Sequence, residues 1–154
     1  MTGKVVLITG GAQRVGAMTA RALHAAGANL VLHYRNSRKP ALDLQTELNQ
    51  KRKNSVILIQ ADLIEIANLP VIVKKSVEQW GKLDILVNNA SSFYGTPVGT
   101  VTENDWDDLV GSNMKAPFFL SQAAAPHLEK QEGCIINIVD IHAQRPMEGH
   151  SVYN

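Results

Sequence analysis

The feature that most constrains the fold of this chain is an alternation of short apolar runs with longer segments of helical periodicity. The apolar runs are rich in β-branched residues and read KVVLIT (4–9), NLVLHY (29–34), SVILIQ (55–60), LDILV (83–87) and CIINIV (134–139). Unbroken apolar runs of this length predict strands that are covered on both faces, as in a parallel sheet.

The segments between these runs are typical of helices. RVGAMTARALHAAG places apolar side chains at helical spacing, namely at Val15, Met18, Ala22, Leu23 and Ala26. ALDLQTELNQKR and VIVKKSVEQWG precede the third and fourth runs, and Gly27 and Gly81 stand where helices commonly end. Because strand–helix–strand crossovers are almost always right-handed, this order predicts a doubly wound α/β sheet of the Rossmann type, in one domain over 1–154.

Composition narrows the class of protein further. A chain of 154 residues with a net charge of +1 has no basic excess that would favour nucleic acid as a partner. Cys134 is the single cysteine, so no internal disulfide can form. No apolar stretch approaches the roughly 20 residues of a membrane helix, and no signal segment stands at the start. We therefore expect a cytoplasmic protein without a membrane or nucleic-acid partner.

The turn after the first predicted strand, ITGGAQRVG, indicates a dinucleotide site. Gly10, Gly11 and Gly16 let the backbone approach a pyrophosphate, whose charge is favoured by the free amides of a helix N-terminus. The alternative is a tight turn without a ligand. Arg14 stands where a small residue is common, and it is either a solvated charge or a clamp for a phosphate or a planar substrate.

The end of the second predicted strand bears on the choice of cofactor. An NAD site usually has an acid there for the ribose 2′-hydroxyl, whereas HYRNSRK contains none and the next acid is Asp43. Arg35 suits a 2′-phosphate, so the sequence predicts NADP(H), with an exposed basic loop as the alternative. Further candidates around Arg35 are His33, Tyr34, Asn36, Ser37 and Arg38.

Five ordered motifs carry a family resemblance. They are TGGAQRVG, ADL at 61–63, NNAS at 88–91, GSNMKAPFFL at 111–120, and INIVD at 136–140 followed by Tyr153. Together they resemble the short-chain dehydrogenases/reductases over the whole chain. The arginine in the glycine loop, the basic HYRNS and the segment NNASSFYGTP are similar to the pteridine reductase branch of that superfamily.

The resemblance implies roles for individual residues. The positions that match the cofactor-binding residues are Gly10, Arg14, Val15, Gly16, Asp62, Leu63, Asn88, Asn89, Ala90 and Ser91. Phe93 would stack on a flat substrate opposite the nicotinamide, with Arg14 and Ser91 beside it. Asn113 matches the family asparagine that positions a helix and a proton-relay water.

Asp140 and Tyr153 are the candidate catalytic pair. Asp140 takes the place of a more common serine, as it does in the pteridine reductase branch, and a carboxyl group can take part in protonating a ring nitrogen. Its alternative roles are a buried structural carboxylate or a helix N-cap. Tyr153 matches the tyrosine of Tyr-x-x-x-Lys, whose lysine position lies beyond Asn154.

A phenol with an ordinary pKa near 10 needs a nearby cation to act efficiently near neutral pH, so we expect only trace activity from these 154 residues. We also expect the C-terminal part of the fold to lie outside this chain, which would leave the strand 134–139 open. The chain would then aggregate or pair with another polypeptide.

The function that the sequence predicts is an NADPH-dependent reductase acting on a dihydropterin or dihydrofolate, in a homo-oligomer that the resemblance implies to be a tetramer. The alternatives are a ketone or 3-oxoacyl reductase, or an NADP-binding fragment without catalysis. His24, His127, His142 and His150 share no ligand spacing, so no metal is expected.

Overall fold

A computed structural model describes residues 1–154, and it contains a parallel five-stranded sheet in the order β3-β2-β1-β4-β5. The strands are β1 (Val5–Ile8), β2 (Asn29–Tyr34), β3 (Val56–Gln60), β4 (Ile85–Asn88) and β5 (Cys134–Asn137). All neighbouring pairs run parallel. This order reverses direction between β1 and β4, which confirms the predicted doubly wound fold and places a ligand crevice at the carboxyl ends of these strands.

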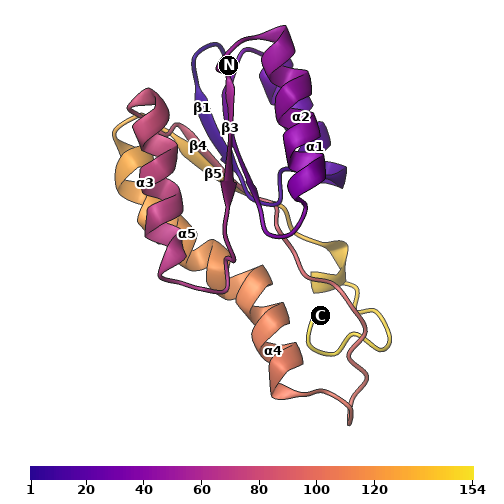
Figure 1. Cartoon of the computed structure of the whole chain (residues 1–154). Coiled ribbons are helices and arrows are strands. Elements are labelled where there is room, and N and C mark those ends of the chain that lie inside the picture. Colours follow the sequence, from indigo (N-terminus) through magenta and orange to yellow (C-terminus); the bar gives the residue numbers. More distant parts are fainter.

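Helices cover both faces of the sheet (Figure 1). They are α1 (Arg14–Ala25), α2 (Arg38–Lys51), α3 (Asn68–Trp80), α4 (Glu103–Val110) and α5 (Ala116–Glu129), with a π-helical turn at Gly111–Lys115 and a 3₁₀ turn at Ile141–Ala143. The first two helices lie on one face and α3 with α5 on the other, while α4 extends beyond the carboxyl ends of the strands (Figure 1).

The core consists of two apolar layers that the strands divide between them. In β1, Val5 and Leu7 belong to the layer under α3 and α5, whereas Val6 and Ile8 belong to the layer under α1 and α2. This division follows from the alternation of side chains along a strand. Both faces of the central strands are therefore buried, as the unbroken apolar runs predict.

The face of helix α1 that packs on the sheet is not the face that carries its large apolar residues. Val15 and Met18 are 58% and 65% exposed. The buried residues are Gly16, Ala17, Ala20 and His24, most of them small. Small side chains allow the helix backbone to lie close to the sheet, and close approach in the first turn is what the glycine loop requires.

The helix ends follow the sequence signals. Gly27 and Gly81 adopt positive φ angles of 96° and 72° just after α1 and α3, where glycine has no steric cost. Thr102 caps α4 in a reciprocal pair with Asp105, whose carboxylate accepts from the Thr102 amide at 2.9 Å. None of the helices combines the length and apolar character that crossing a bilayer requires.

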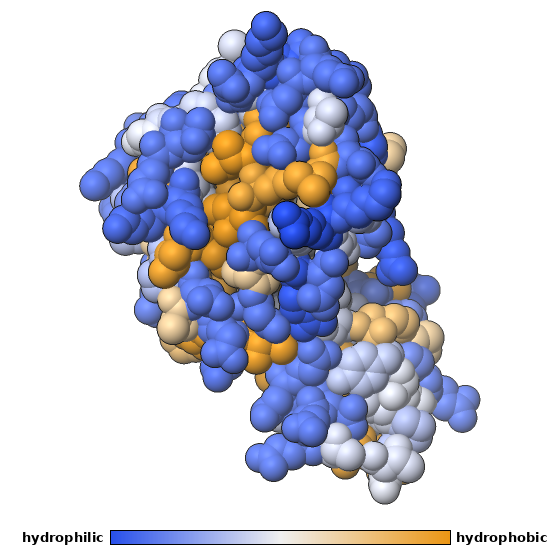
Figure 2. Space-filling view, in the orientation of Figure 1, coloured by the Kyte–Doolittle hydropathy of each residue, from blue (hydrophilic) through white to orange (hydrophobic).

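The two edges of the sheet differ in how far they are covered. At the β3 edge, apolar side chains are visible only as a band between the hydrophilic outer surfaces of α2 and α3 (Figure 2). At the opposite edge all of β5 is exposed, and Ile136 has 44% of its surface accessible. The strand ends at Asn137, two residues earlier than expected, because the chain leaves β4 after the Ile138 amide bonds the Asn88 carbonyl at 2.9 Å.

Candidate active site

A cavity of about 790 Å³ opens at the carboxyl ends of β1, β2, β4 and β5. Its lining brings together most of the residues that the sequence nominates: Gly10, Arg14, Val15, Gly16, Tyr34, Arg35, Ser37, Ala90, Ser91, Phe93, Asp140 and Tyr153, with Asn89 beside them. The glycine loop and the two candidate catalytic residues, far apart in sequence, thus face one space.

The glycine loop is shaped by two positions that exclude a side chain. Gly10 has a φ of +59°, and a Cβ there would lie 3.0 Å from Cα of Ala90. A Cβ on Gly16 would collide with the Gly10 carbonyl oxygen and lie 2.7 Å from Nδ2 of Asn89. The loop is therefore packed against the end of β4 and the start of α1, and only glycine fits at either position.

The segment after β4 holds the same loop through hydrogen bonds. Asn89 donates from Nδ2 to the carbonyls of Thr9 and Gly10, at 2.9 and 3.2 Å. The Thr9 hydroxyl accepts from the backbone amides of Asn89 and Ala90, at 2.9 and 3.0 Å. Asn89 therefore holds the glycine loop in place from the end of β4. Asn88 is buried, bonds Ser121 and Asn137, and does not reach the cavity.

His33 does not line the cavity, contrary to its expected place beside the 2′-phosphate. Only 2% of it is exposed. Its Nδ1 lies 3.3 Å from the amide nitrogen of Gly10 and its Nε2 lies 3.1 Å from the carbonyl oxygen of Ala61. Burial lowers the pKa of His33, against the opposing effects of the Ala61 carbonyl and Asp62. The side chain is thus a neutral, internal group.

The basic end of β2 is paired with carboxylates. Arg35 Nη1 lies 3.5 Å from Asp108 Oδ1 on α4 and 3.9 Å from Asp62 Oδ2 after β3. Ser37 donates to Oε1 of Gln13 at 3.1 Å, which ties this end of β2 to the glycine loop. Of the other nominated residues here, Asn36, Asp62 and Leu63 lie outside the cavity lining.

Arg14 combines a charge in the cavity with an unusual backbone. It lines the cavity and begins α1 with a φ of +47°, in the left-handed region that costs most residues about 1–2 kcal/mol. A non-glycine residue in this region is uncommon, and such strain often accompanies function.

Asp140 and Tyr153 are in direct contact. The Tyr153 hydroxyl donates to Oδ2 of Asp140 at 3.0 Å, and Oδ1 accepts from the His142 amide at 3.1 Å as the cap of the 3₁₀ turn. The His142 amide, followed by the Tyr153 hydroxyl, lowers the pKa of Asp140. Burial raises the pKa of Tyr153, and Asp140 raises it further. Near neutral pH the pair is therefore a carboxylate bonded to a protonated phenol.

Aromatic side chains complete the wall around this pair. Phe93 meets Tyr153 edge-on with ring centroids 4.8 Å apart, and its face stacks on His150 at 4.9 Å and an interplanar angle of 13°. A flat ring thus already occupies the face of Phe93. The sequence motifs did not indicate His150, because its stacking depends on a loop contact rather than on local spacing.

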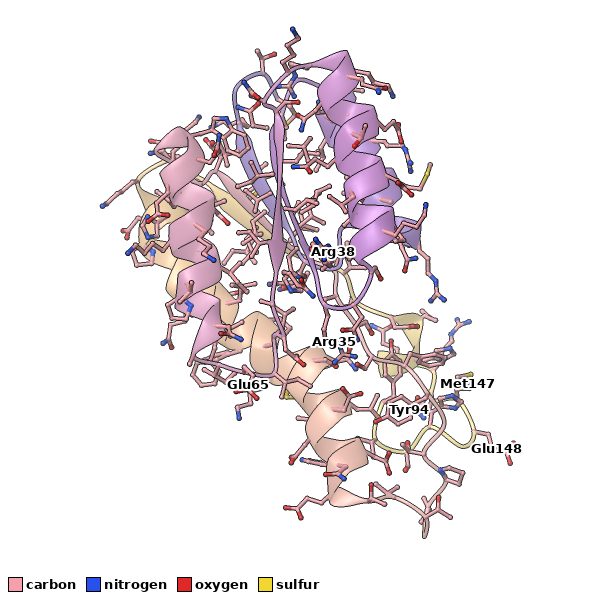
Figure 3. The ribbon with its side chains drawn as sticks, viewed as in Figure 1. Arg35, Arg38, Glu65, Tyr94, Met147 and Glu148 are labelled. Atoms are coloured by element: carbon pink, nitrogen blue, oxygen red, sulfur yellow. The ribbon has the colours of Figure 1, made fainter.

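The segment that carries Tyr153 is fastened to the loop after β4 at Thr96. The Thr96 amide donates to the Gly149 carbonyl at 2.6 Å, and Thr96 Oγ1 accepts from the Val152 amide at 3.1 Å. In Figure 3, Tyr94 on one loop and Met147 on the other mark the two sides of this contact. The position of the phenol therefore depends on backbone bonds between two surface loops.

Asn113 lies in the π-helical turn rather than in the cavity lining. Its Nδ2 donates to the Ser92 carbonyl at 2.8 Å, and its Oδ1 accepts from the Ser92 amide at 3.2 Å. This two-bond contact holds the backbone between Ser91 and Phe93. Sequence reasoning missed five further lining residues, Ala12, Gln13, Ile138, Val139 and Ile141. No group of three or more His, Cys, Asp or Glu side chains is placed to hold a metal ion.

Comparison with known proteins places this arrangement in a family. The sequence profile described as short chain dehydrogenase matches residues 4–154. Pteridine reductase 1 of Leishmania tarentolae is 37% identical over 190 residues, which cover 99% of this chain and 66% of that protein. An uncharacterized oxidoreductase of Staphylococcus aureus (strain USA300) is 30% identical over 155 residues, covering 100% of this chain and 65% of that protein.

A hydroxynaphthalene reductase-like protein of Metarhizium anisopliae is 30% identical over 154 residues, covering 99% of this chain and 57% of that protein. The chain thus spans 57% to 66% of the length of these relatives. The profile match, the doubly wound sheet and the glycine loop agree, and the chain belongs to the short-chain dehydrogenase family.

Proposed function

We propose that this protein is an NADPH-dependent reductase that reduces a C=N bond of a dihydropterin or dihydrofolate. The observation that carries the proposal is the hydrogen-bonded pair of Tyr153 and Asp140, 3.0 Å apart, facing the glycine loop across one cavity. The similarity to pteridine reductase 1 supports this choice of substrate class.

The residues present fit a dinucleotide. Glycine at positions 10 and 16 leaves room for a pyrophosphate against the start of α1, where unpaired amides and the helix dipole favour negative charge. Arg35 and Ser37 at the end of β2 offer a guanidinium and a hydroxyl to a 2′-phosphate. A bound nicotinamide supplies the hydride. Arg35 must then exchange two carboxylate neighbours for the phosphate.

Reduction of a C=N bond adds a hydride to carbon and a proton to nitrogen. The Tyr153 O–H bond breaks as the new N–H bond forms, and the phenolate takes a proton back from water. Asp140, whose pKa is lowered, stays ionised and accepts the phenol hydrogen bond, which keeps the proton on Tyr153 until substrate arrives. Positioned proton transfer of this kind is worth roughly 10²–10⁴ in rate.

The cavity also suits a flat, polar substrate. The face of Phe93 stacks on the His150 ring in the present structure, and a pterin ring has the shape to take that place. Arg14 supplies a planar cation to the lining of the same cavity, and its guanidinium can donate two parallel hydrogen bonds to a heterocycle. An aliphatic ketone makes no use of either feature.

The test of the reaction is NADPH oxidation in the presence of dihydrobiopterin. In a protein that also supplies the lysine of Tyr-x-x-x-Lys, Tyr153→Phe is expected to lower kcat by about 10²–10⁴ while the Kd for NADPH stays within about 2-fold; in the 154 residues alone it should remove the trace turnover. Tyr94→Phe is the matched control, because its hydroxyl donates to the Asp105 carbonyl at 3.4 Å and does not line the cavity. Equal rates for wild type and Tyr153→Phe, or turnover of ketones without turnover of pterins, would contradict the proposal.

The test of the cofactor is the ratio of Kd values for NADH and NADPH. Loss of a charge-assisted bond to the 2′-phosphate in Arg35→Ala is expected to weaken NADPH binding by about 10-fold and to leave NADH binding unchanged. Arg38→Ala, three residues on and outside the cavity lining, is the control. NADH bound as tightly as NADPH by the wild type would contradict the cofactor assignment.

A further inference from the structure

His33 joins two backbone segments that the proposed cofactor would touch. Its Nδ1 is 3.3 Å from the Gly10 amide in the glycine loop, and its Nε2 is 3.1 Å from the carbonyl of Ala61, the residue before Asp62 and Leu63. The backbone reinforces this junction, because the carbonyl of His33 accepts from the Gly11 amide at 2.9 Å. His33, in β2, therefore contacts both the segment that follows β1 and the segment that follows β3.

The hydrogen-bond roles of the ring follow from its partners. The Ala61 carbonyl can only accept, so Nε2 must carry the proton and donate. The Gly10 amide can only donate, so Nδ1 must be unprotonated and accept. A single neutral tautomer satisfies both contacts. A protonated ring would turn an N–H toward the Gly10 N–H and lose that bond.

We propose that His33 is a positioning residue of the dinucleotide loop: its neutral imidazole holds the Gly10 amide from the β2 side, and the Ala61 carbonyl fixes the tautomer that does so. This inference rests on the proposed function, since the loop is taken to bind the cofactor. His33 itself contacts no cofactor, because it is buried and lies outside the cavity lining.

The geometry of Gly10 shows why such a support is needed. Its peptide groups are held from opposite sides, the amide by His33 and the carbonyl by Nδ2 of Asn89 at 3.2 Å. Its φ of +59° is a conformation that the chain alone does not enforce. Two side chains, one on β2 and one just after β4, thus fix both peptide groups of Gly10 in the position that the pyrophosphate would meet.

The charges around His33 determine how it responds to acid. Burial lowers its pKa below the ordinary value of 6.5, and Arg35 lowers it further, while the Ala61 carbonyl and Asp62 act in the opposite direction. Arg35 and Asp62 are the charged groups that act on the ring, and they face each other at 3.9 Å. The ring therefore stays neutral near neutral pH, and the support at Gly10 is lost only in acid.

Two substitutions separate the two contacts. The amide oxygen of His33→Asn takes the place of Nδ1 and can still accept from Gly10, whereas the amide nitrogen of His33→Gln takes the place of Nε2 and can still donate to Ala61. We expect His33→Gln to weaken NADPH binding by about 5- to 10-fold and His33→Asn by no more than about 2-fold. Equal Kd values for wild type and both variants would overturn the proposal.

A second measurement does not depend on the cofactor. Hydrogen exchange of the Gly10 amide in the free protein is expected to be about 5- to 10-fold faster in His33→Gln than in wild type or His33→Asn. As pH falls below 6.5, wild type should lose NADPH affinity more steeply than His33→Asn; both share the titration of the 2′-phosphate, so it cancels in the comparison. Parallel pH profiles would contradict the role of the ring.

These outcomes also separate the two proposals. If wild type does not bind NADPH but Gly10 exchange responds to His33→Gln, the proposed function fails and the contact stands. If NADPH binds and neither Gly10 exchange nor the Kd responds to the variant, the proposed function stands and the role of His33 is wrong.

Discussion

The two walls of the cavity are built differently. The cofactor wall, residues 9–16, is held by buried groups on neighbouring strands: Thr9 and His33 are each 2% exposed, and their hydrogen bonds tie the loop to β4 and β2. The reactive wall, residues 138–154, follows β5, in which every residue is exposed. After the bond from the Ile138 amide to the Asn88 carbonyl, it is attached to the rest of the molecule by the Thr96 contact and the aromatic contacts of Phe93.

This difference means that the residues proposed to bind the cofactor are held more firmly than the residues proposed to transfer the proton. Hydrogen bonds inside a packed core are lost only when the core opens, whereas bonds between surface loops open at little cost. We therefore expect the cofactor wall to be ordered before any ligand binds. The position of the Tyr153 phenol, by contrast, should depend on a few exposed backbone bonds.

The largest effect on cofactor affinity should come from filling the cofactor wall. In Gly16→Ala the new methyl group meets the Gly10 carbonyl oxygen and Nδ2 of Asn89, so the loop must move. Overpacking of this kind costs about 1–3 kcal/mol, which corresponds to a loss of NADPH affinity of about 5- to 150-fold. Gly111→Ala is the matched control, since its nearest neighbour is a flexible side chain at 3.4 Å. Unchanged NADPH affinity in Gly16→Ala would show that the cofactor wall is not as tightly packed as the comparison of the two walls assumes.

The reactive wall should respond to loss of one hydroxyl. Thr96→Val keeps the shape of the side chain but removes the acceptor of the Val152 amide, a bond worth about 0.5–1.5 kcal/mol. Exchange at Val152 should become about 2- to 10-fold faster while NADPH affinity stays the same. Thr100→Val removes only a bond to Pro97 and serves as the control. A fall in NADPH affinity would show that the two walls are not independent.

Because the backbone of Arg14 is strained, replacing Arg14 by glycine should stabilise the fold but weaken pterin binding. Glycine accepts a φ of +47° without the penalty that arginine bears, although it loses more entropy on folding. The free energy of unfolding of Arg14→Gly should therefore rise by about 0.5–1 kcal/mol, measured by urea denaturation, while pterin binding weakens. A destabilised variant would mean that the arginine side chain supports the fold.

Acid should act on the buried histidines before it acts on the pair of Asp140 and Tyr153. Burial lowers the pKa of both His24 and His33, so their contribution to stability is complete above 6.5 and is lost as pH falls through their lowered values. The pKa of Asp140 lies below 3.8, so its bond to Tyr153 persists to lower pH. Unfolding free energy measured against pH should start to fall below 6.5, and less so in His24→Gln. A curve that is flat down to pH 4 would contradict this order.

The smallest effect concerns the pairing of Arg35. Asp108→Asn removes the carboxylate 3.5 Å from Nη1, and exposed pairs of this kind are worth 1 kcal/mol or less. NADPH affinity should therefore improve by about 2- to 3-fold at low salt, with no change for NADH. Asp107→Asn, the neighbouring carboxylate without an ion pair to Arg35, is the control. Weaker NADPH binding in Asp108→Asn would mean that Asp108 helps rather than competes.

The fold was largely predictable because each strand is an unbroken apolar run. All five predicted runs contain the observed strands, apart from Asn88, which extends β4 by one residue. The buried face of α1 was less predictable. Gly16 and Ala17 are buried while Val15 and Met18 are exposed, and this depends on how close the helix lies to the sheet. That distance is set by the glycine loop and by tertiary packing.

Site residues were predictable where a sequence motif determines their position. They were not predictable where their role depends on the direction in which the side chain points. The motifs nominated Asp140 and Tyr153, and the structure places them in contact. The sequence predicts a place for His33 beside the 2′-phosphate because the residue stands in a basic segment. Its neighbour two residues earlier on β2, Val31, is in the core, and this alternation was a signal that His33 also points inward.

The most direct test of the account is amide hydrogen exchange along the chain with and without NADPH. We expect the hydrogen-bonded amides of 9–11 and those of 87–90 to be protected in the free protein, 147–153 to exchange fast, and NADPH to slow exchange at 12–16, where the amides at the start of α1 are unpaired. Fast exchange at 9–11 without ligand, or no response of 12–16 to NADPH, would contradict the claim of a preformed cofactor wall.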